Sequence, residues 1–128
     1  MMDLSKIKFP AEAGSGIFDS VAENAAKEIR DSKVNKKTQI RKFYDELIMW
    51  NERVQHSKIS KEEKYIELEP FIKMLKAKVT YAKGRGHIDE KFQSIFNHCI
   101  DQIKDAKTLQ HAKLFMEAVT GYSRELEK

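Results

Sequence analysis

Apolar residues recur along most of this chain at intervals of three and four, the spacing that places them on one side of an α-helix. The pattern predicts helices at about residues 17–29, 39–55, 60–83, 89–104 and 108–122. The segment 89–104 has the most regular spacing, so we expect it to be central to the core. Its apolar positions are Phe92, Ile95, Phe96, Cys99, Ile100 and Ile103.

Residues at the starts of these segments have side chains suited to begin a helix. Thr38 and Thr108 are candidate N-caps, because a threonine hydroxyl accepts a hydrogen bond from a free amide of the first turn. Ser60 followed by Glu63 has the spacing of a capping box. We therefore expect the second, third and fifth helices to begin at or just after these residues.

The third segment contains a proline and ends in glycines. Pro70 lacks a backbone donor and clashes with the preceding turn, which predicts a kink or break near Glu69. The helix is expected to resume and to continue to about Lys83. Gly84 and Gly86 follow, and glycine readily adopts the left-handed conformation that closes a helix.

The first 16 residues differ from the rest of the chain. Residues 1–16 mix single apolar side chains with Pro10, Gly14 and Gly16, so they predict a flexible N-terminal arm. Residues 17–128 then form the helical part of a single domain covering 1–128. The predicted fold class is all-α, a compact bundle of about five helices with a flexible N-terminal arm.

Composition agrees with this class. The chain has 128 residues, 41% of them apolar, which is enough for one sizeable core, and only five glycines and two prolines. No apolar run approaches the roughly 20 residues of a membrane span, so we expect no membrane partner. Cys99 is the single cysteine, which excludes an internal disulfide and favours a cytoplasmic location.

Positive charge is concentrated in the middle of the chain. Residues 33–85 contain 14 Lys and Arg against seven Asp and Glu, whereas the segments before and after are slightly acidic. The same stretch holds Trp50 and three of the four tyrosines. A basic surface of this kind attracts polyanions, most often nucleic acid.

The helix after Pro70 combines three kinds of surface. The expected core-facing line contains Phe71, Leu75, Val79 and Ala82, and the far side contains Lys73, Lys76, Thr80 and Lys83. A third line at the border of the apolar face contains Met74, Lys78, Tyr81 and Arg85. Two cations beside an aromatic side chain near a helix end suit phosphate contact with base stacking. Lys78, Tyr81 and Arg85 are therefore candidate nucleic-acid contacts.

Catalytic chemistry finds no support in the sequence. The four histidines, at 56, 87, 98 and 111, show no metal-ligand spacing with each other or with Cys99. Gly84 and Gly86 lack the length and the following Lys-Ser/Thr of a phosphate-binding loop. We predict no catalytic residue, no metal and no cofactor, and hence a protein that is not an enzyme.

Three motifs resemble the Csm small subunit of type III-A CRISPR effector complexes. They are KKTQIRKFYDEL at 36–47, FIKMLKAKVTYAKGR at 71–85 and IKDAKTLQHAKLFMEAVTGY at 103–122. The resemblance implies a non-catalytic helical subunit that stacks in several copies along a ribonucleoprotein filament. It also implies contact with the backbone and large subunits, and with target RNA paired to guide RNA.

The resemblance further implies which residues contact RNA. The first motif gives Lys37, Thr38 and Arg41, and the second gives Lys78, Tyr81 and Arg85. From spacing alone, Arg41 is equally well explained as an ion pair with Asp45 four residues later. Contact of these side chains with the target strand or the heteroduplex backbone would be independent of base sequence.

Other functions remain open at this point. The segment 39–53 has the character of a DNA recognition helix if the preceding helix lies against it across a short turn. A structural adaptor that docks an acidic protein on the basic surface is a further alternative. Trp50 and Met49 suit a homodimer of the isolated chain, and Trp50 fits the core or a partner interface better than a platform for a nucleobase.

Overall fold

The computed structural model describes residues 2–32 and 34–126, and in these residues all regular structure is helical. A 3₁₀ turn η1 (Leu4–Lys6) precedes six α-helices. They are α1 (Ser20–Arg30), α2 (Lys37–Gln55), α3 (Lys61–Lys73), α4 (Leu75–Gly84), α5 (Glu90–Asp101) and α6 (Ala106–Leu126). The predicted all-α bundle is confirmed, and α3 and α4 together correspond to the third predicted helix.

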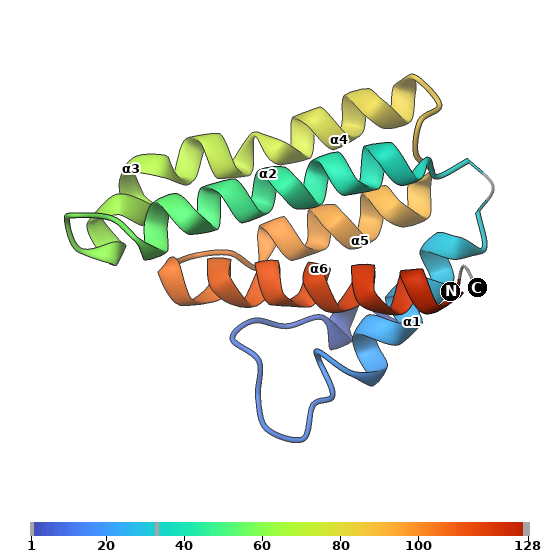
Figure 1. Ribbon diagram of the computed structural model, residues 1–128, viewed down its shortest axis with the longest axis horizontal. Helices are drawn as coiled ribbons and strands as arrows, with labels where there is room; N and C mark the ends of the chain where they lie inside the picture. The colour runs from blue at the N-terminus through green and yellow to red at the C-terminus, as the bar shows by residue number, and fades with distance from the viewer. Residues whose placement is uncertain (1, 33, 127–128) are drawn as a thin grey trace.

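The helices form a bundle in which α6 has a central place (Figure 1). It packs against both α1 and α2, while α4 packs on α5 and α2 packs on α3. The core contains the rings of Phe43 and Phe96, whose centroids are 5.8 Å apart, and Phe92 stacks on Phe96 at 5.6 Å. The regular apolar face of α5 is buried, as its spacing predicts.

The break in the third predicted helix lies one turn later than expected. Helix α3 continues through Pro70 and ends at Lys73, and Met74 alone separates it from α4. Because Pro70 has no backbone N–H, the carbonyl of Ile66, four residues earlier, has no helical hydrogen-bond donor. Pro70 and Ile66 are both exposed. The prediction of a break near Glu69 is wrong because water can satisfy that carbonyl on the exposed side of the helix.

Two of the three predicted helix starts differ from the structure. Helix α2 begins at Lys37 with Lys36 as its N-cap, so Thr38 lies inside the first turn and is not the cap. At α6 the Asp105 carboxylate accepts the Thr108 amide at 2.8 Å, and the Thr108 hydroxyl accepts the Asp105 amide at 3.0 Å. Thr108 is therefore the partner of the capping residue, an arrangement like a capping box.

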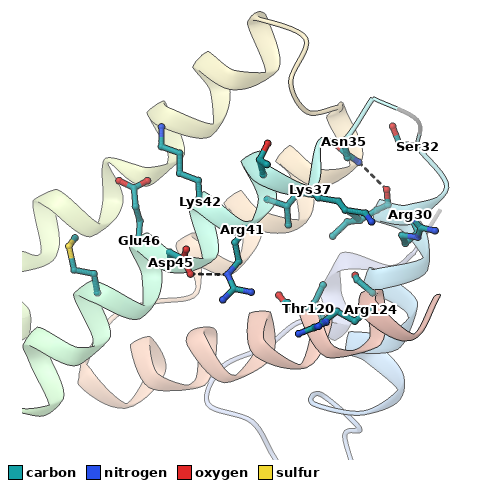
Figure 2. Close-up of a pocket in the computed structure, with 16 residues that line it drawn as sticks. Arg30, Ser32, Asn35, Lys37, Arg41, Lys42, Asp45, Glu46, Thr120 and Arg124 are labelled. Carbon is teal, nitrogen blue, oxygen red and sulfur yellow. Dashed lines mark hydrogen bonds and ion pairs between the residues drawn. The ribbon is translucent and has the colours of Figure 1, made fainter. Parts of the chain in front are cut away.

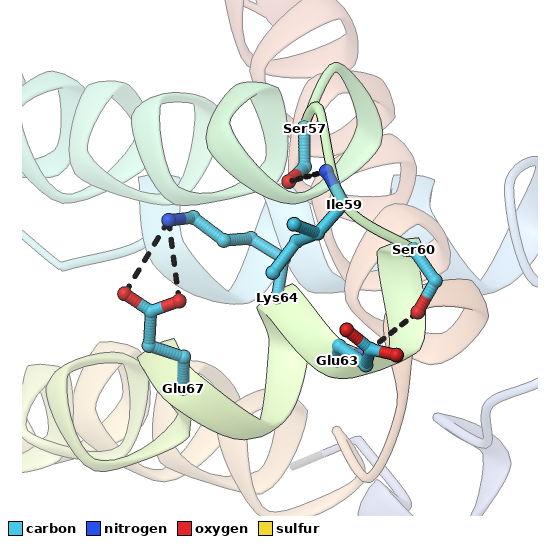
Figure 3. Close-up of polar contacts among 6 residues, drawn as sticks. All are labelled: Ser57, Ile59, Ser60, Glu63, Lys64 and Glu67. Carbon is cyan, nitrogen blue, oxygen red and sulfur yellow. Dashed lines mark hydrogen bonds and ion pairs between the residues drawn. The ribbon is translucent and has the colours of Figure 1, made fainter.

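The start of α3 is as predicted (Figure 3). The Ser60 hydroxyl accepts the Glu63 amide at 3.1 Å. One turn later, Lys64 and Glu67 form an ion pair at 3.3 Å on the surface. Two boundaries also shift: the first helix begins at Ser20, and α5 ends at Asp101 rather than at residue 104.

The N-terminal segment is not a flexible arm, contrary to the prediction. Ile7 is fully buried and Phe9 is 5% exposed, with its ring edge-on to Phe115 at 6.0 Å. Two histidines of the bundle also hold its backbone. Nε2 of His98 lies 2.8 Å from the Ile7 carbonyl, and Nδ1 of His111 accepts the Ala11 amide at 2.9 Å. The irregular segment thus completes the core. Its burial could not be predicted from the sequence, because its apolar residues are single and unevenly spaced.

The bond between Ala11 and His111 predicts a pH dependence of stability. Nδ1 accepts a proton only when the ring is neutral, and burial followed by the nearby Lys107 lowers the pKa of His111. The free energy of unfolding should therefore be greatest above the unfolded pKa of about 6.5 and fall as pH drops through the lowered folded pKa. Chemical denaturation between about pH 7 and pH 5 measures this fall.

His111→Gln keeps an acceptor for the Ala11 amide but does not titrate. It should reduce the pH dependence, whereas Gln110→Ala, at an exposed site of the same helix, should leave it unchanged. An identical pH profile for wild type and His111→Gln would contradict this explanation.

Candidate nucleic-acid interface

The start of α2 and the end of α4 meet at the backbone. The amide of Lys36, the residue that precedes α2, donates to the carbonyl of His87 at 3.1 Å. His87 follows α4 by three residues. The two helix ends that carry the candidate site residues therefore lie side by side, as the interpretation of a shared surface requires.

Asn35 fixes this junction through three hydrogen bonds. Its amide nitrogen donates to the Ile29 carbonyl at 3.1 Å and to the Asp89 carboxylate at 3.0 Å, and its oxygen accepts the Asp89 amide at 2.8 Å. Asp89 also caps α5 by accepting the Phe92 amide at 2.9 Å. The end of α1 and the starts of α2 and α5 are thus joined at one residue.

The charge of Asp89 suits this role. Burial alone would raise the pKa of its carboxyl group, but hydrogen bonds from the Phe92 amide and from the Ser32 and Asn35 side chains outweigh burial and lower the pKa. The carboxylate is therefore ionised at neutral pH. It holds the loop before α2 and the first turn of α5 at the same time.

Helix α4 ends in a well-defined turn. Gly86 has a φ of 75°, in the left-handed region that glycine favours. The Gly86 amide donates to the Lys83 carbonyl at 2.9 Å, and the His87 amide donates to the Ala82 carbonyl at 3.0 Å. These two hydrogen bonds are the pair that defines a Schellman motif. The glycine predicted to close the helix does so, and Arg85 occupies the fixed position just before it.

Three of the candidate residues line a cleft between α1, α2 and α6 (Figure 2). This α1–α2–α6 cleft has a volume of about 800 Å³. Lys37, Thr38 and Arg41 belong to its lining. Ile29 and Val119 are buried beneath it, and its lining cations are Arg30, Lys37, Arg41, Lys42 and Arg124. Five cations against Asp45 and Glu46 make the cleft a positively charged surface over an apolar floor.

Arg41 makes the ion pair that its spacing predicts. Its Nε donates to the Asp45 carboxylate at 3.1 Å, and the Arg41 side chain remains 60% exposed (Figure 2). An exposed pair of this kind contributes about 0–1 kcal/mol. The guanidinium therefore remains accessible to a phosphate that competes with Asp45.

The other three candidates line a groove on the opposite flank of α2. This α2–α4 groove has a volume of about 550 Å³ and includes Lys78, Tyr81 and Arg85. The Tyr81 ring is 66% exposed, and its hydroxyl accepts a hydrogen bond from Arg85 at 3.1 Å. Lys78 donates to Glu46 of α2 at 2.8 Å. The predicted stripe is thus a real surface feature, with a ring and a guanidinium held together.

The two sets of candidates line two grooves and not one. Lys42 lines both of them and lies on the ridge of α2 that separates them. Gln39 also lines the α2–α4 groove. Sequence reasoning missed both residues, although Lys42 is 100° from Arg41 around the helix and so had to lie beside that set.

Some residues have roles that differ from those predicted. Phe71 does not face the core but is 53% exposed. Lys73 and Lys76, expected on a solvent-facing side, bind the end of α5: the Lys73 ammonium donates to the carbonyls of Ile100 at 2.8 Å and Ile103 at 2.6 Å, and Lys76 pairs with Asp101. Burial lowers the pKa of Lys73, against the effect of nearby carboxylates. These two lysines stabilise the fold.

Neither the single thiol nor the possible metal ligands form a reactive site in the residues that the structure describes. Cys99 is fully buried, and burial raises the pKa of its thiol well above the ordinary value. In residues 2–32 and 34–126, no three His, Cys, Asp or Glu side chains gather in a way that would hold a metal ion. Within the same residues, no helix is both long and apolar enough to span a membrane.

Fold and surface together define a small, basic helical bundle with cation-lined grooves on both flanks of one helix. A family model described as Csm2 Type III-A matches residues 15–128. The chain therefore belongs to the Csm2 family, the small subunit of type III-A CRISPR complexes, and membership implies association with other subunits of such complexes. Comparisons with curated proteins and with solved structures gave no match.

The Asn35 junction gives a prediction for stability. Asn35→Ala removes three hydrogen bonds and should lower the free energy of unfolding by about 1–3 kcal/mol. Exchange of the Lys36 amide with solvent should become faster, because its bond to His87 depends on the position of the loop. Denaturant titration and hydrogen exchange measure the two effects.

Gln110→Ala, at an exposed site on α6, serves as the matched control and should change neither quantity. Unaltered stability together with unaltered exchange at Lys36 in Asn35→Ala would show that Asn35 does not hold the junction.

Proposed function

We propose that this chain is the non-catalytic small subunit of a type III-A RNA-guided complex and that it binds the RNA backbone without sequence preference. Family membership supports the assembly, and the charge distribution supports the ligand. The six contact residues are Lys37, Thr38, Arg41, Lys78, Tyr81 and Arg85. Affinity then comes mainly from phosphate contacts and counterion release.

The observation that carries the proposal is the placement of Lys42 between the two grooves. Because it lines both, cations follow one another across α2 from the α1–α2–α6 cleft to the α2–α4 groove. A phosphate backbone that crosses the start of α2 meets Arg41, then Lys42, then the Lys78 side of the surface. The backbone bond between Lys36 and His87 holds the start of α2 beside the end of α4.

Each contact residue has a distinct role in this proposal. Lys37, Arg41, Lys78 and Arg85 neutralise phosphates, and the Thr38 hydroxyl adds a hydrogen bond without charge. Tyr81 offers an exposed ring for stacking, and the Arg85 guanidinium lies 5.8 Å from its centroid. The exposed Arg41–Asp45 pair can exchange carboxylate for phosphate. Lys78 is 42% exposed and its partner Glu46 only 21%, so Lys78 meets a phosphate while it stays paired with Glu46.

The remaining parts of the proposal concern assembly. Several copies stack along the complex beside the backbone subunits and help hold target RNA paired with guide RNA. Each copy contributes only a few cations, so repetition along the filament raises the avidity. Cleavage of the target then belongs to another subunit, and this chain contributes binding alone in the cytoplasm.

The alternative of a sequence-specific DNA regulator finds less support. A helix-turn-helix joins its helices by a turn of three to four residues, whereas residues 31–36 separate α1 from α2. An adaptor for an acidic protein would use the same cations, and salt-insensitive partner binding without RNA affinity would favour it.

Substitution of the two arginines tests the proposal. Arg41→Ala and Arg85→Ala should each weaken binding of single-stranded RNA to the same extent for different sequences. Each should also reduce the slope of log affinity against log salt by about 0.7 for every phosphate that the variant no longer neutralises. Fluorescence anisotropy over a range of salt concentrations measures both quantities. The fold should remain intact, because both side chains are exposed.

Lys58→Ala removes an exposed cation that lines neither groove and is the matched control. It should bind RNA like wild type. If the two arginine variants also bind RNA like wild type at low salt, the surface is not the RNA-binding site.

A further inference from the structure

A partly exposed stack of two aromatic rings lies outside the six contact residues. The rings of Trp50 in α2 and Phe71 in α3 have centroids 5.9 Å apart and an interplanar angle of 18°. The Arg53 guanidinium lies 5.1 Å from the Trp50 centroid. Phe71 is 53% exposed, so about half of its surface is accessible to a further planar group. We call Trp50, Phe71 and Arg53 the aromatic platform.

Packing of the core does not explain the platform. The nearby residues Ile72 of α3 and Leu75 of α4 are fully buried and fill the core side. Trp50 covers part of the core with one side, but its Nε1 is buried with no hydrogen-bond partner among the described residues. A phenylalanine held half-exposed on an indole contributes little to core burial, which leaves recognition as a reason for its position.

The platform is continuous with the proposed RNA surface. Phe71, Met74, Lys78, Tyr81 and Arg85 follow one another at intervals of three, four, three and four, one line along α3 and α4. Met74 is 55% exposed and already lines the α2–α4 groove with Lys78 and Tyr81. At 1.5 Å per residue the line is roughly 20 Å long. Stacked nucleotides rise ~3.4 Å each, so several fit along it.

The chemistry of this line alternates rings and cations. Two ring positions, the platform and Tyr81, are separated by Lys78, and each has an arginine within 6 Å of a ring: Arg53 at Trp50 and Arg85 at Tyr81. Sequence-independent sites for single strands combine these two features, with bases stacking on rings and phosphates meeting cations. A duplex hides its base faces and gains nothing from exposed rings.

We propose that the aromatic platform binds an unpaired nucleobase of the RNA, and that Phe71 and Tyr81 are two stacking positions for one single-stranded segment. This inference rests on the proposed RNA-binding function and adds that, beside the paired target strand, the surface takes an unpaired stretch of RNA. A protein partner would more simply meet an apolar surface without the interleaved Lys78, Arg85 and Arg53 charges.

Trp50 is the only tryptophan, so its fluorescence reports on the platform directly. Three probes of equal length separate the contributions: a single-stranded oligoadenylate, an abasic oligonucleotide with the same phosphates, and the corresponding RNA duplex. The oligoadenylate should bind and quench Trp50. The abasic strand and the duplex should bind through their phosphates and leave the fluorescence nearly unchanged.

Variants at residue 71 give the second readout, with affinity measured by anisotropy of labelled RNA. Phe71→Leu should weaken binding of the oligoadenylate by about 5- to 100-fold and leave the abasic strand unaffected. Phe71→Tyr keeps a planar ring and should retain wild-type affinity. Ile66→Ala, at a residue 72% exposed and away from the line, is the control.

The outcomes separate this inference from the proposed function. Absence of all RNA binding in wild type would overturn both. Salt-dependent RNA binding without quenching, or with Phe71→Leu equal to wild type on every probe, would overturn the platform and leave the proposed function standing. Equal quenching by duplex and single strand would also overturn it. If Phe71→Leu impairs only the binding of another protein subunit, the platform is a protein interface and the inference is wrong.

Discussion

The hydrogen bond from the Lys36 amide to the His87 carbonyl is the constraint on which the candidate surface depends. Residues 36 and 87 are far apart in sequence. Helices α2, α3 and α4 lie between them, and the end of α4 returns to the start of α2. Asn35 and Asp89 hold the two chain segments together beside this bond. This contact between the loop before α2 and the turn after α4 brings the cations of the two helices to one surface. On that surface Lys42 lies on a ridge between the two grooves.

Periodicity predicted the helices well because each helix buries a face whose apolar spacing is local in sequence. Caps and breaks were less predictable, since they depend on which backbone groups find other partners. Thr108 accepts bonds from the cap instead of being the cap, and Pro70 is tolerated where water reaches the freed carbonyl. The N-terminal segment escaped prediction for a different reason. Ile7 and Phe9 are buried by contacts with α5 and α6, distant in sequence, and no period identifies them.

The candidate site was predictable in part. Exposure of Lys78, Tyr81 and Arg85 followed from their position at the border of an apolar face, and the structure agrees. Charge alone could not separate Lys73 and Lys76, which bind the end of α5, from cations that remain available on the surface. Phe71 was expected in the core because its spacing fits, but Ile72 and Leu75 occupy that space. The role of Lys42 required the arrangement of α2 between α4 and α6.

Photocrosslinking of RNA within the assembled type III-A complex tests the central claim most directly, because it maps contacts by residue without altering the chain. Mass spectrometry of the crosslinked peptides should find RNA attached to the first half of α2 and to the segment from the end of α3 through α4. Crosslinks to both segments in one preparation are the predicted result. Crosslinks confined to α5 or to the acidic start of α3, with none on α2 or α4, would contradict a shared RNA surface at the Lys36–His87 junction.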